Sequence, residues 1–122
     1  MSAVPPPRFA HMVTSITCCI RPGGALLVRD YGLYDLPMLR FAPSAALAGD
    51  SSGRVFMRRD GTLARFFERH ELRDAVLSAA AAEGSPLACD AAEWCCVIVR
   101  NRGEGLAMRR VFVHAAFTRQ VE

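Results

Sequence analysis

The sequence predicts a single α/β domain, and three patterns carry that prediction. An unbroken apolar run at 25–28 follows the turn-forming Pro and Gly residues at 22–24 and has no polar face of its own. Such a run is typical of a strand covered on both sides, as in a parallel sheet. Apolar residues recur at helical spacing over 9–20 and 72–80, and residues 111–117 alternate as in a strand. A chain of 122 residues that is 52% hydrophobic is long enough for one small domain with a packed core.

The first helix is expected to begin after the prolines at 5–7 and to run to about Ile20. The turn that ends it leads into the strand at 25–28, which runs directly into polar and aromatic residues. Since ligands bind beyond the carboxyl ends of strands in open α/β sheets, this strand end is a candidate wall of an active site. Asp35 is expected to cap a short helical turn over 36–41.

A long connection leads from this helical turn to a β-hairpin. Residues 42–53 are small and polar and are expected to form a flexible surface loop. Residues 54–67 predict a hairpin with a two-residue turn at Asp60 and Gly61, because both positions tolerate positive φ. Its mixture of arginine and phenylalanine suits an RNA backbone with splayed bases; the alternative is a phenylalanine core beneath a solvated arginine face. The residues concerned are Arg54, Arg58, Arg59, Arg65, Phe56, Phe66 and Phe67.

The last elements are a helix and two strands. The apolar stripe at 72–80 predicts the helix, with Gly84 as its C′ residue, although residues 68–70 include none of the usual N-cap types. The apolar run at 94–99 predicts a second buried strand. The short loop at 100–106 favours an antiparallel pairing of the last two strands.

Charge and cysteine content narrow the functional classes. The net charge is +3 and every one of the 15 basic residues is arginine. This excess alone is too mild to indicate nucleic-acid binding, but arginine is well suited to bidentate phosphate contacts and base stacking. No apolar run approaches the roughly 18 residues of a membrane span, and the N-terminus lacks the features of a secretory signal.

The cysteines and histidines lack zinc spacing, and no histidine has a catalytic partner nearby, so we expect no metal. Five cysteines with two adjacent pairs do not resemble a disulfide framework, and we expect buried free thiols in the cytoplasm. These cysteines are Cys18, Cys19, Cys89, Cys95 and Cys96.

Several motifs spread over nearly the whole chain carry a resemblance to a known family. They are Arg21-Pro-Gly-Gly before the strand, Arg29-Asp-Tyr-Gly-Leu-Tyr-Asp35, Met38-Leu-Arg-Phe41, Arg58-Arg-Asp-Gly-Thr62, Phe66-Phe67, and a tail with Glu104-Gly-Leu and Arg110-Val-Phe. Together they resemble the methyltransferase-like family that makes 3-methylcytidine in tRNA. Ser2-Ala-Val-Pro5 resembles the family's segment at the end of strand four, where a His usually precedes the proline. Glu68-Arg69 stands where the family usually has a helix-capping threonine.

The resemblance implies the C-terminal half of a Rossmann-like class I methyltransferase sheet, with an inserted β-hairpin at 54–67 and an antiparallel last strand. Residues 1–122 would form one partial domain, from the end of strand four to strand seven. The family uses S-adenosyl-L-methionine to methylate N3 of a cytidine in the tRNA anticodon arm. Its Gly-rich loop and ribose-binding acidic residue have no counterpart here and would lie upstream of Met1, so we expect this chain to be inactive alone.

The same resemblance assigns roles at the end of the strand. Methyl transfer to a ring nitrogen depends largely on positioning, and neutral cytosine N3 needs no deprotonation. Asp30 could accept from the exocyclic amine and stabilise the charge that grows on the ring, or simply pair with Arg29 or cap the next turn. Tyr31 or Tyr34 could stack on a flipped base. The expected catalytic residues are Asp30, Tyr31 and Arg29, and the expected RNA-binding residues are Tyr34, Arg40, Arg58, Asp60 and Arg65.

The expected partners are tRNA and a protein such as a tRNA synthetase, with no membrane and no metal. The cytoplasm is the expected compartment, and the mitochondrion is the alternative. A competing hypothesis is a non-catalytic module that binds RNA or completes another chain. A third is a truncated gene or decayed copy without function.

Overall fold

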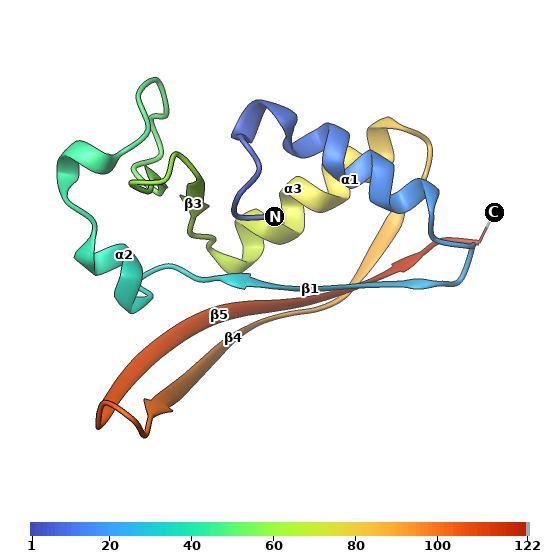
Figure 1. The fold of residues 1–122 in the computed structure, drawn as a ribbon. Coiled ribbons are helices and arrows are strands. Elements are labelled where there is room, and N and C mark those ends of the chain that lie inside the picture. Colours follow the sequence, from blue (N-terminus) through green and yellow to red (C-terminus); the bar gives the residue numbers. More distant parts are fainter. Residues whose placement is uncertain (122) are drawn as a thin grey trace.

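The computed structural model describes residues 1–121 as a mixed α/β fold with antiparallel sheets, which confirms the predicted class. The larger sheet has the strand order β1–β5–β4, with β1 at Ala25–Tyr31, β5 at Leu106–Arg119 and β4 at Leu87–Asn101. Helices α1 (Phe9–Cys18) and α3 (Arg69–Ala82) cover one face of this sheet (Figure 1). A 3-10 turn, η1 (Pro6–Arg8), precedes α1.

The β1 strand forms as predicted, but its surroundings differ from the prediction. Within residues 1–121 it is an edge strand, and its ladder partner β5 runs antiparallel. Val28 is buried on the helix side, whereas Leu27 on the opposite side is 77% exposed. The expectation of a parallel strand covered on both faces is therefore wrong for the described chain. An apolar run determines neither the direction of the neighbouring strand nor whether a second covering layer belongs to the same chain.

The larger hydrophobic core lies between the two helices and the covered face of the sheet. A second one, formed by Leu33, Phe56, Ala64 and Phe66, lies at the β2–β3 hairpin, so the alternative of a phenylalanine core in the hairpin is confirmed. The stripe of α1 is narrower than predicted, since Ile16 and Ile20 are only half-buried and Cys19 is exposed. Thr17 is fully buried instead, and its hydroxyl donates to the carbonyl of Thr14 at 3.0 Å, so no polar group is left unpaired. The larger core includes Phe9, Val13, Val28, Phe67, Leu72, Val76, Val113 and Phe117.

The predicted hairpin at 54–67 is present as β2 (Val55–Met57) and β3 (Leu63–Arg65), which pair antiparallel. Its turn is longer than the predicted two residues. Arg58 N donates to Thr62 O at 2.8 Å, which leaves three residues between the paired positions, and Gly61 has φ +85°. A three-residue loop that ends in a left-handed glycine is the next most common hairpin connection, so the two-residue expectation was wrong.

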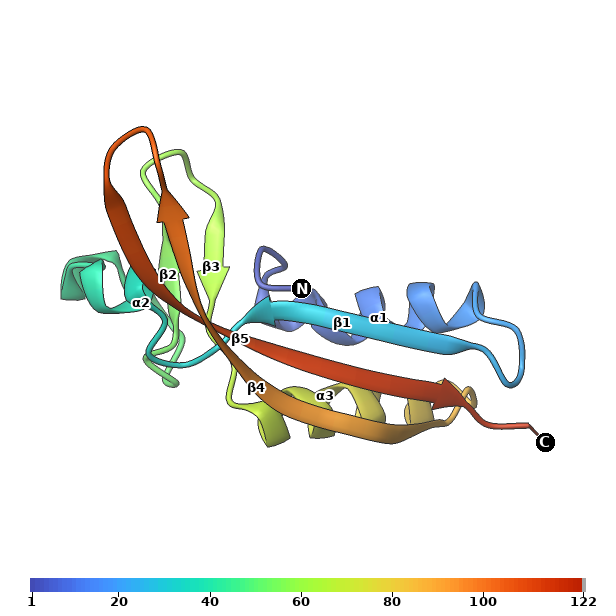
Figure 2. The same cartoon turned by 90° about the horizontal axis from the view of Figure 1, so that it is seen from below.

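The β4 and β5 strands pair antiparallel, as the short loop between them predicts. They are longer than expected, and their outer part projects beyond the end of β1 (Figures 1 and 2). Neither α1 nor α3 covers this part, and Ile98 and Val99 are 59% and 41% exposed. Trp94 lies level with Asp30 of β1 and is 39% exposed. The prediction of a buried strand at 94–99 was therefore wrong, because an apolar run can also form a twisted two-stranded ribbon outside the core.

The helix ends are specified by local hydrogen bonds. Glu68 is the N-cap of α3, and its carboxylate accepts from the backbone N–H groups of His70 and Glu71 at 2.8 and 3.0 Å. A glutamate thus supplies the cap that the sequence lacks in its usual form. Gly84, with φ +71°, ends α3 as predicted. The predicted helical turn is α2 (Leu36–Arg40), with Asp35 as its N-cap.

The remaining expectations concern the connection at 42–53, the thiols and the membrane. The connection contains a 3-10 turn, η2 (Pro43–Ala45), and its flexibility remains a prediction. All five cysteines are free, but three are exposed and two are half-buried, so the expectation of buried thiols was wrong. No helix within residues 1–121 is long and apolar enough to cross a membrane.

Candidate functional site

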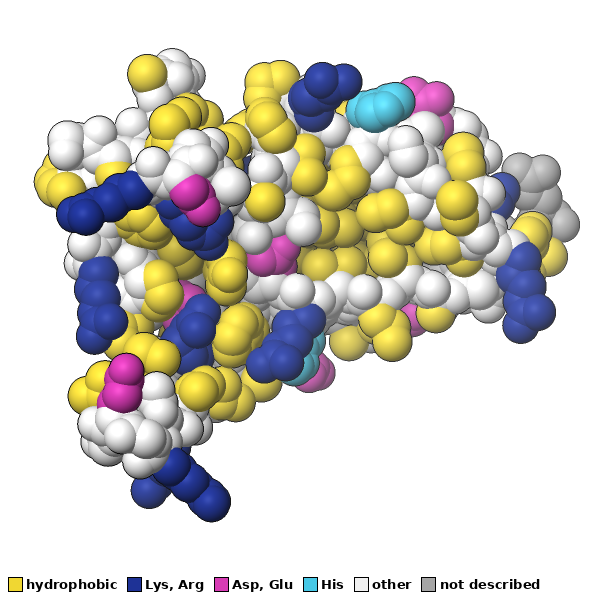
Figure 3. All heavy atoms as spheres, viewed as in Figure 1, with side chains coloured by type: hydrophobic (Ala, Val, Ile, Leu, Met, Phe, Trp, Pro, Cys, Tyr) yellow, Lys and Arg dark blue, Asp and Glu magenta, His cyan; other side chains and the backbone are white. Residues whose placement is uncertain are grey.

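The motif-bearing residues gather beyond the end of β1. We call this part of the molecule the exit end; it comprises the turn at 32–35, α2, the β2–β3 hairpin and the outer part of β4 and β5. The two hairpins project at this end of the molecule, which also carries α2 (Figures 1 and 2). Several arginine side chains gather over the same end (Figure 3). This arrangement brings together sequence segments that are far apart in the chain.

Tyr31 lies at the centre of an arginine–aromatic cluster, formed by Arg29, Tyr31, Arg58, Arg110 and Phe112. Its ring centroid is 6.4 Å from that of Phe112. The guanidinium carbons of Arg58 and Arg110 lie 5.9 and 5.7 Å from the Tyr31 ring centre. Arg29 lies 4.3 Å from the ring centre of Phe112. A cation–π contact leaves the edge of a guanidinium group able to bind phosphate oxygens. Arg58 keeps this capacity in part, because its Nη1 donates to the Leu63 carbonyl at 2.9 Å.

The charges in this cluster are unequal. Arg110 forms a bidentate ion pair with Asp35, with Nε at 2.9 Å from Oδ1 and Nη2 at 3.0 Å from Oδ2. This hydrogen-bonded pairing raises the pKa of the Arg110 guanidinium, although burial opposes the shift. No carboxylate of residues 1–121 forms an ion pair with Arg29 or Arg58. The cluster therefore carries an excess of positive charge.

Tyr34 stands at the surface beside this cluster. Its side chain is 69% exposed, and its φ is +63°, the only positive φ at a non-glycine residue within residues 1–121. Non-glycine residues adopt this conformation rarely, and when they do they are often functional. Tyr34 was predicted as a stacking residue, and the backbone strain is an independent reason to examine it.

The predicted catalytic residues lie on two faces of the sheet. Asp30 points toward the helix side, where its carboxylate accepts from the Ser2 amide at 2.7 Å and the Tyr31 amide at 2.8 Å, and pairs with the Met1 amino group at 2.9 Å. Arg29 and Tyr31 point to the open face, because side chains alternate along a strand. The structure thus brings Arg29 and Tyr31 together and separates them from the Asp30 carboxylate.

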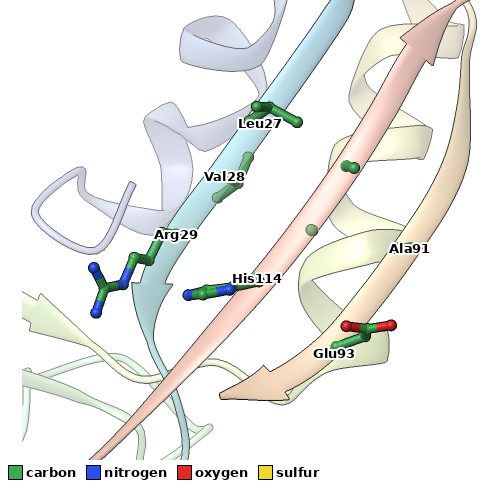
Figure 4. Close-up of a pocket in the computed structure, with 8 residues that line it drawn as sticks. Leu27, Val28, Arg29, Ala91, Glu93 and His114 are labelled. Atoms are coloured by element: carbon green, nitrogen blue, oxygen red, sulfur yellow. The ribbon is translucent and has the colours of Figure 1, made fainter. Parts of the chain in front are cut away.

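The open face carries a hollow of about 300 Å³ (Figure 4). Its polar rim is a cross-strand row in which His114 of β5 lies between Arg29 of β1 and Glu93 of β4. The next row, Leu27, Ala116 and Ala91, forms an apolar floor. The hollow can receive an apolar group with a polar edge. Sequence analysis missed His114 and Glu93 because a site made across strands depends on their register.

The other predicted RNA-binding residues are placed differently. Arg40 is exposed at the end of α2. Asp60 caps its own turn, accepting from the Thr62 amide and hydroxyl. Arg65 packs over Phe9 and Phe67, with guanidinium-to-ring distances of 5.3 and 4.7 Å. It also pairs with Glu71 at 3.6 Å, so Arg65 is less available to RNA than the exposed Arg40.

Arg110 and Phe112 complete the cluster, although the sequence did not single them out as site residues. Their contacts with Asp35 and Tyr31 join positions about 75 residues apart in the chain. Their place in the Arg110-Val-Phe motif was the available signal. No group of three or more His, Cys, Asp or Glu side chains in the described chain is arranged to hold a metal ion.

Comparison with known proteins shows which class of protein this chain is similar to. No protein-family model matches the chain. It is 33% identical over 119 residues to the tRNA N(3)-cytidine methyltransferase METTL2 of Mus musculus, covering 98% of this chain and 28% of that protein. It is 33% identical over 117 residues to Mettl2 of Drosophila melanogaster, a tRNA N(3)-methylcytidine methyltransferase, covering 96% of this chain and 33% of that protein. It is 30% identical over 122 residues to O-methyltransferase 3 of Dictyostelium discoideum, of which it covers 26%.

The chain is therefore related to methyltransferases over nearly its whole length. More specifically, the similarity confirms the predicted relationship to the tRNA 3-methylcytidine methyltransferases. The chain spans a third or less of the length of these relatives.

Proposed function

We propose that this chain is the C-terminal, RNA-contacting part of an S-adenosyl-L-methionine-dependent tRNA methyltransferase that acts on N3 of a cytidine in the anticodon arm. The observation that carries the proposal is the arginine–aromatic cluster. It unites Tyr31 from the Arg29–Asp35 motif with Arg58 from the Arg58–Thr62 motif and Phe112 from the tail. All three motifs resemble the family, and the relatives carry the corresponding name.

The chain alone does not fit the cofactor. A ribose is typically held by a carboxylate that accepts from its hydroxyls. At the exit end Asp30 is occupied by backbone amides, Asp35 by Arg110 and Asp60 by Thr62. No Gly-rich loop follows a strand in the sequence. We infer that the cofactor is held mainly by residues outside this chain and that the chain is inactive without them.

The role proposed for this chain's own residues is to bind and position the RNA. Arg29, Arg58 and Arg40 would bind phosphates, and Tyr31 or Tyr34 would stack on a base. For Asp30 to stabilise the cytosine ring by accepting from its exocyclic amine, the base would have to reach the helix side of β1 and displace an amide partner from the carboxylate. The role of Asp60 would be to shape the turn that presents Arg58, and that of Arg65 to brace the hairpin against Phe67.

A second candidate is a non-catalytic module that binds RNA and completes another chain. The free edge of β1 and the open face of the sheet favour it, because an edge strand can pair with a further strand. The occupant would be a cofactor-binding chain; a tRNA synthetase is a further possible protein partner. For either candidate we propose the cytoplasm as the compartment, with the mitochondrion as the alternative.

Titrating the purified chain with tRNA and with S-adenosyl-L-methionine separates these candidates. We expect the chain to bind tRNA and to bind the cofactor weakly. We expect methyl transfer only after a cofactor-binding part is added. Methyl transfer by this chain alone would eliminate the second candidate. Absence of tRNA binding would contradict both.

A substitution series tests whether the cluster is the binding surface. Replacing Arg29 and Arg58 with Ala should weaken tRNA binding and reduce the slope of log affinity against log salt by about 0.7 for each single-stranded phosphate that the variant no longer binds. Arg21→Ala is the matched control, because Arg21 is exposed and lies just before the opposite end of β1. Equal effects of the two changes would show that binding depends on overall charge and not on the cluster.

A further inference from the structure

Tyr34 occupies the third position of a tight turn, where its residue type is unusual. The turn is closed by Asp35 N donating to Gly32 O at 3.2 Å. A positive φ at the third position is typical of a type II turn, which takes Gly or Asn there. The φ of Tyr34 is +63°, so a large aromatic side chain sits where a glycine would be unstrained. Strain of this kind persists only where the surrounding structure over-determines it.

Two backbone hydrogen bonds attach the first two residues of the turn to neighbouring segments. Gly32 N donates to Val111 O at 2.9 Å, which attaches the start of the turn to β5. Leu33 N donates to Phe67 O at 3.0 Å, which attaches it to the segment after β3. These bonds hold the residues before Tyr34.

Asp35 fixes the residue after Tyr34, and it does so from a fully buried position. Its side chain is 0% exposed, and its carboxylate accepts from the Val111 amide at 2.9 Å and the Leu36 amide at 3.1 Å. It also accepts from Arg110 Nε at 2.9 Å and Nη2 at 3.0 Å. A buried carboxylate with this many donors has one stable orientation. Asp35 cannot touch a bound RNA, so any effect it has on RNA binding is indirect.

We propose that Asp35 and Arg110 are positioning residues that hold the Tyr34 backbone in its left-handed conformation and so present the ring as a stacking surface for an unpaired base of the substrate RNA. The inference rests on the proposed function and adds a specificity element to it. An exposed aromatic ring with the cations of Arg40 and Arg58 at the same end of the molecule has the chemistry of a single-strand binding surface, in which the ring takes a base and the arginines take the phosphates.

Substitutions of Tyr34 test whether the ring is used and whether the backbone is strained. The probe is a fluorescently labelled RNA stem-loop with cytidine in its loop, and a blunt RNA duplex serves as the control ligand. Tyr34→Phe should bind the stem-loop like the wild type, and Tyr34→Ala and Tyr34→Gly should bind it about 5- to 100-fold more weakly. Tyr34→Gly should also raise the thermal midpoint Tm by roughly 2–4 °C, because glycine adopts positive φ without strain.

A double-mutant cycle tests the role of Asp35. Asp35→Asn keeps an acceptor for the Leu36 and Val111 amides but loses the ionic bidentate pair with Arg110. It should weaken stem-loop binding in the wild-type background and have little further effect in the Tyr34→Ala background, since both changes remove the same ring from the RNA. Arg110→Lys, which keeps the charge and loses the fork geometry, is the second variant should Asp35→Asn not fold. Glu71→Gln, which weakens the partly exposed ion pairs of Arg54 and Arg65, is the control.

The outcomes separate this inference from the proposed function. Additive losses in the cycle, or wild-type binding by Tyr34→Ala, would overturn the stacking role while leaving tRNA binding intact. No stem-loop binding by the wild-type chain would overturn the proposed function and the stacking role together. The change in Tm then still decides the positioning role: a gain from Tyr34→Gly that shrinks in the Asp35→Asn background supports it, and an undiminished gain contradicts it.

Discussion

The helix-covered half of the sheet and the exit end use the same strands for different purposes. Under α1 and α3 the side chains are apolar, tightly packed and fully buried, as Phe117 and Val113 of β5 illustrate. On the same strand, beyond the helices, Arg110 and Phe112 build an arginine–aromatic cluster around Tyr31. The strained backbone of Tyr34 also lies at the exit end. The difference indicates that the covered half is built for stability, whereas the exit end combines a small core of its own with side chains that are available for binding.

The largest expected contrast comes from truncating one side chain in each region. Phe117→Ala should lower the free energy of unfolding by about 3–5 kcal/mol, because Phe117 is fully buried and its truncation leaves a cavity in the core. Ile98→Ala, on the exposed outer part of β4, should change it by about 0.5 kcal/mol or less. Urea unfolding measures both, and similar losses would show that the outer hairpin is packed against something in solution.

A substitution at the junction of the two regions should cause an intermediate loss of unfolding free energy. A Cβ at Gly32 would lie 2.9 Å from Trp94 Cζ3 and 3.0 Å from Val111 Cγ1, closer than side chains normally approach. Gly32→Ala should therefore cost about 1–3 kcal/mol of unfolding free energy. Trp94→Leu in the same chain should recover part of the loss by removing the ring. Gly103→Ala is the matched control, because its Cβ would meet only Asn101 Oδ1 at 3.5 Å, and a comparable loss there would contradict the clash as the cause.

Sequence patterns predicted the covered half better than the exit end. Helical spacing predicted α1 and α3, since each helix needs only its own residues to define the apolar stripe. The covering of β1 was mispredicted, because it depends on layers that a short apolar run does not identify. The outer part of β4 was mispredicted for the same reason: most of the apolar run at 94–99 lies in the two-stranded part of the β4–β5 hairpin and not in the core.

The candidate functional site was likewise predicted only in part from the sequence. Motif resemblance predicted Tyr31, Tyr34 and Arg58 as site residues, and the structure brings them to one end of the molecule. The opposite orientations of Arg29 and Asp30 follow from strand alternation and were available from the sequence. The pair of Asp35 with Arg110 was not available, because it depends on the register of β1 against β5.

The smallest expected effect is at the tip of the β2–β3 hairpin, where the exit end is most exposed. Hydrogen bonds from the Thr62 hydroxyl and then from its amide lower the pKa of the Asp60 carboxyl below its ordinary value of 3.8. Because the folded-state pKa lies below that of the unfolded chain, the ionised turn stabilises the fold fully above about pH 3.8. This contribution is lost as the pH falls through the lowered pKa.

Thr62→Val separates the two donors. It removes the hydroxyl, which donates to Asp60 Oδ1 at 2.6 Å, and keeps the amide, which donates at 3.0 Å. An NMR titration of the Asp60 carboxyl should therefore show its pKa rise toward 3.8 without reaching it. Thr14→Val is the control, because that hydroxyl donates to the carbonyl of Ala10 within α1 and should leave Asp60 unchanged. An Asp60 titration that is the same in Thr62→Val and the wild type would instead assign the lowered pKa to the Thr62 backbone amide and to Arg58.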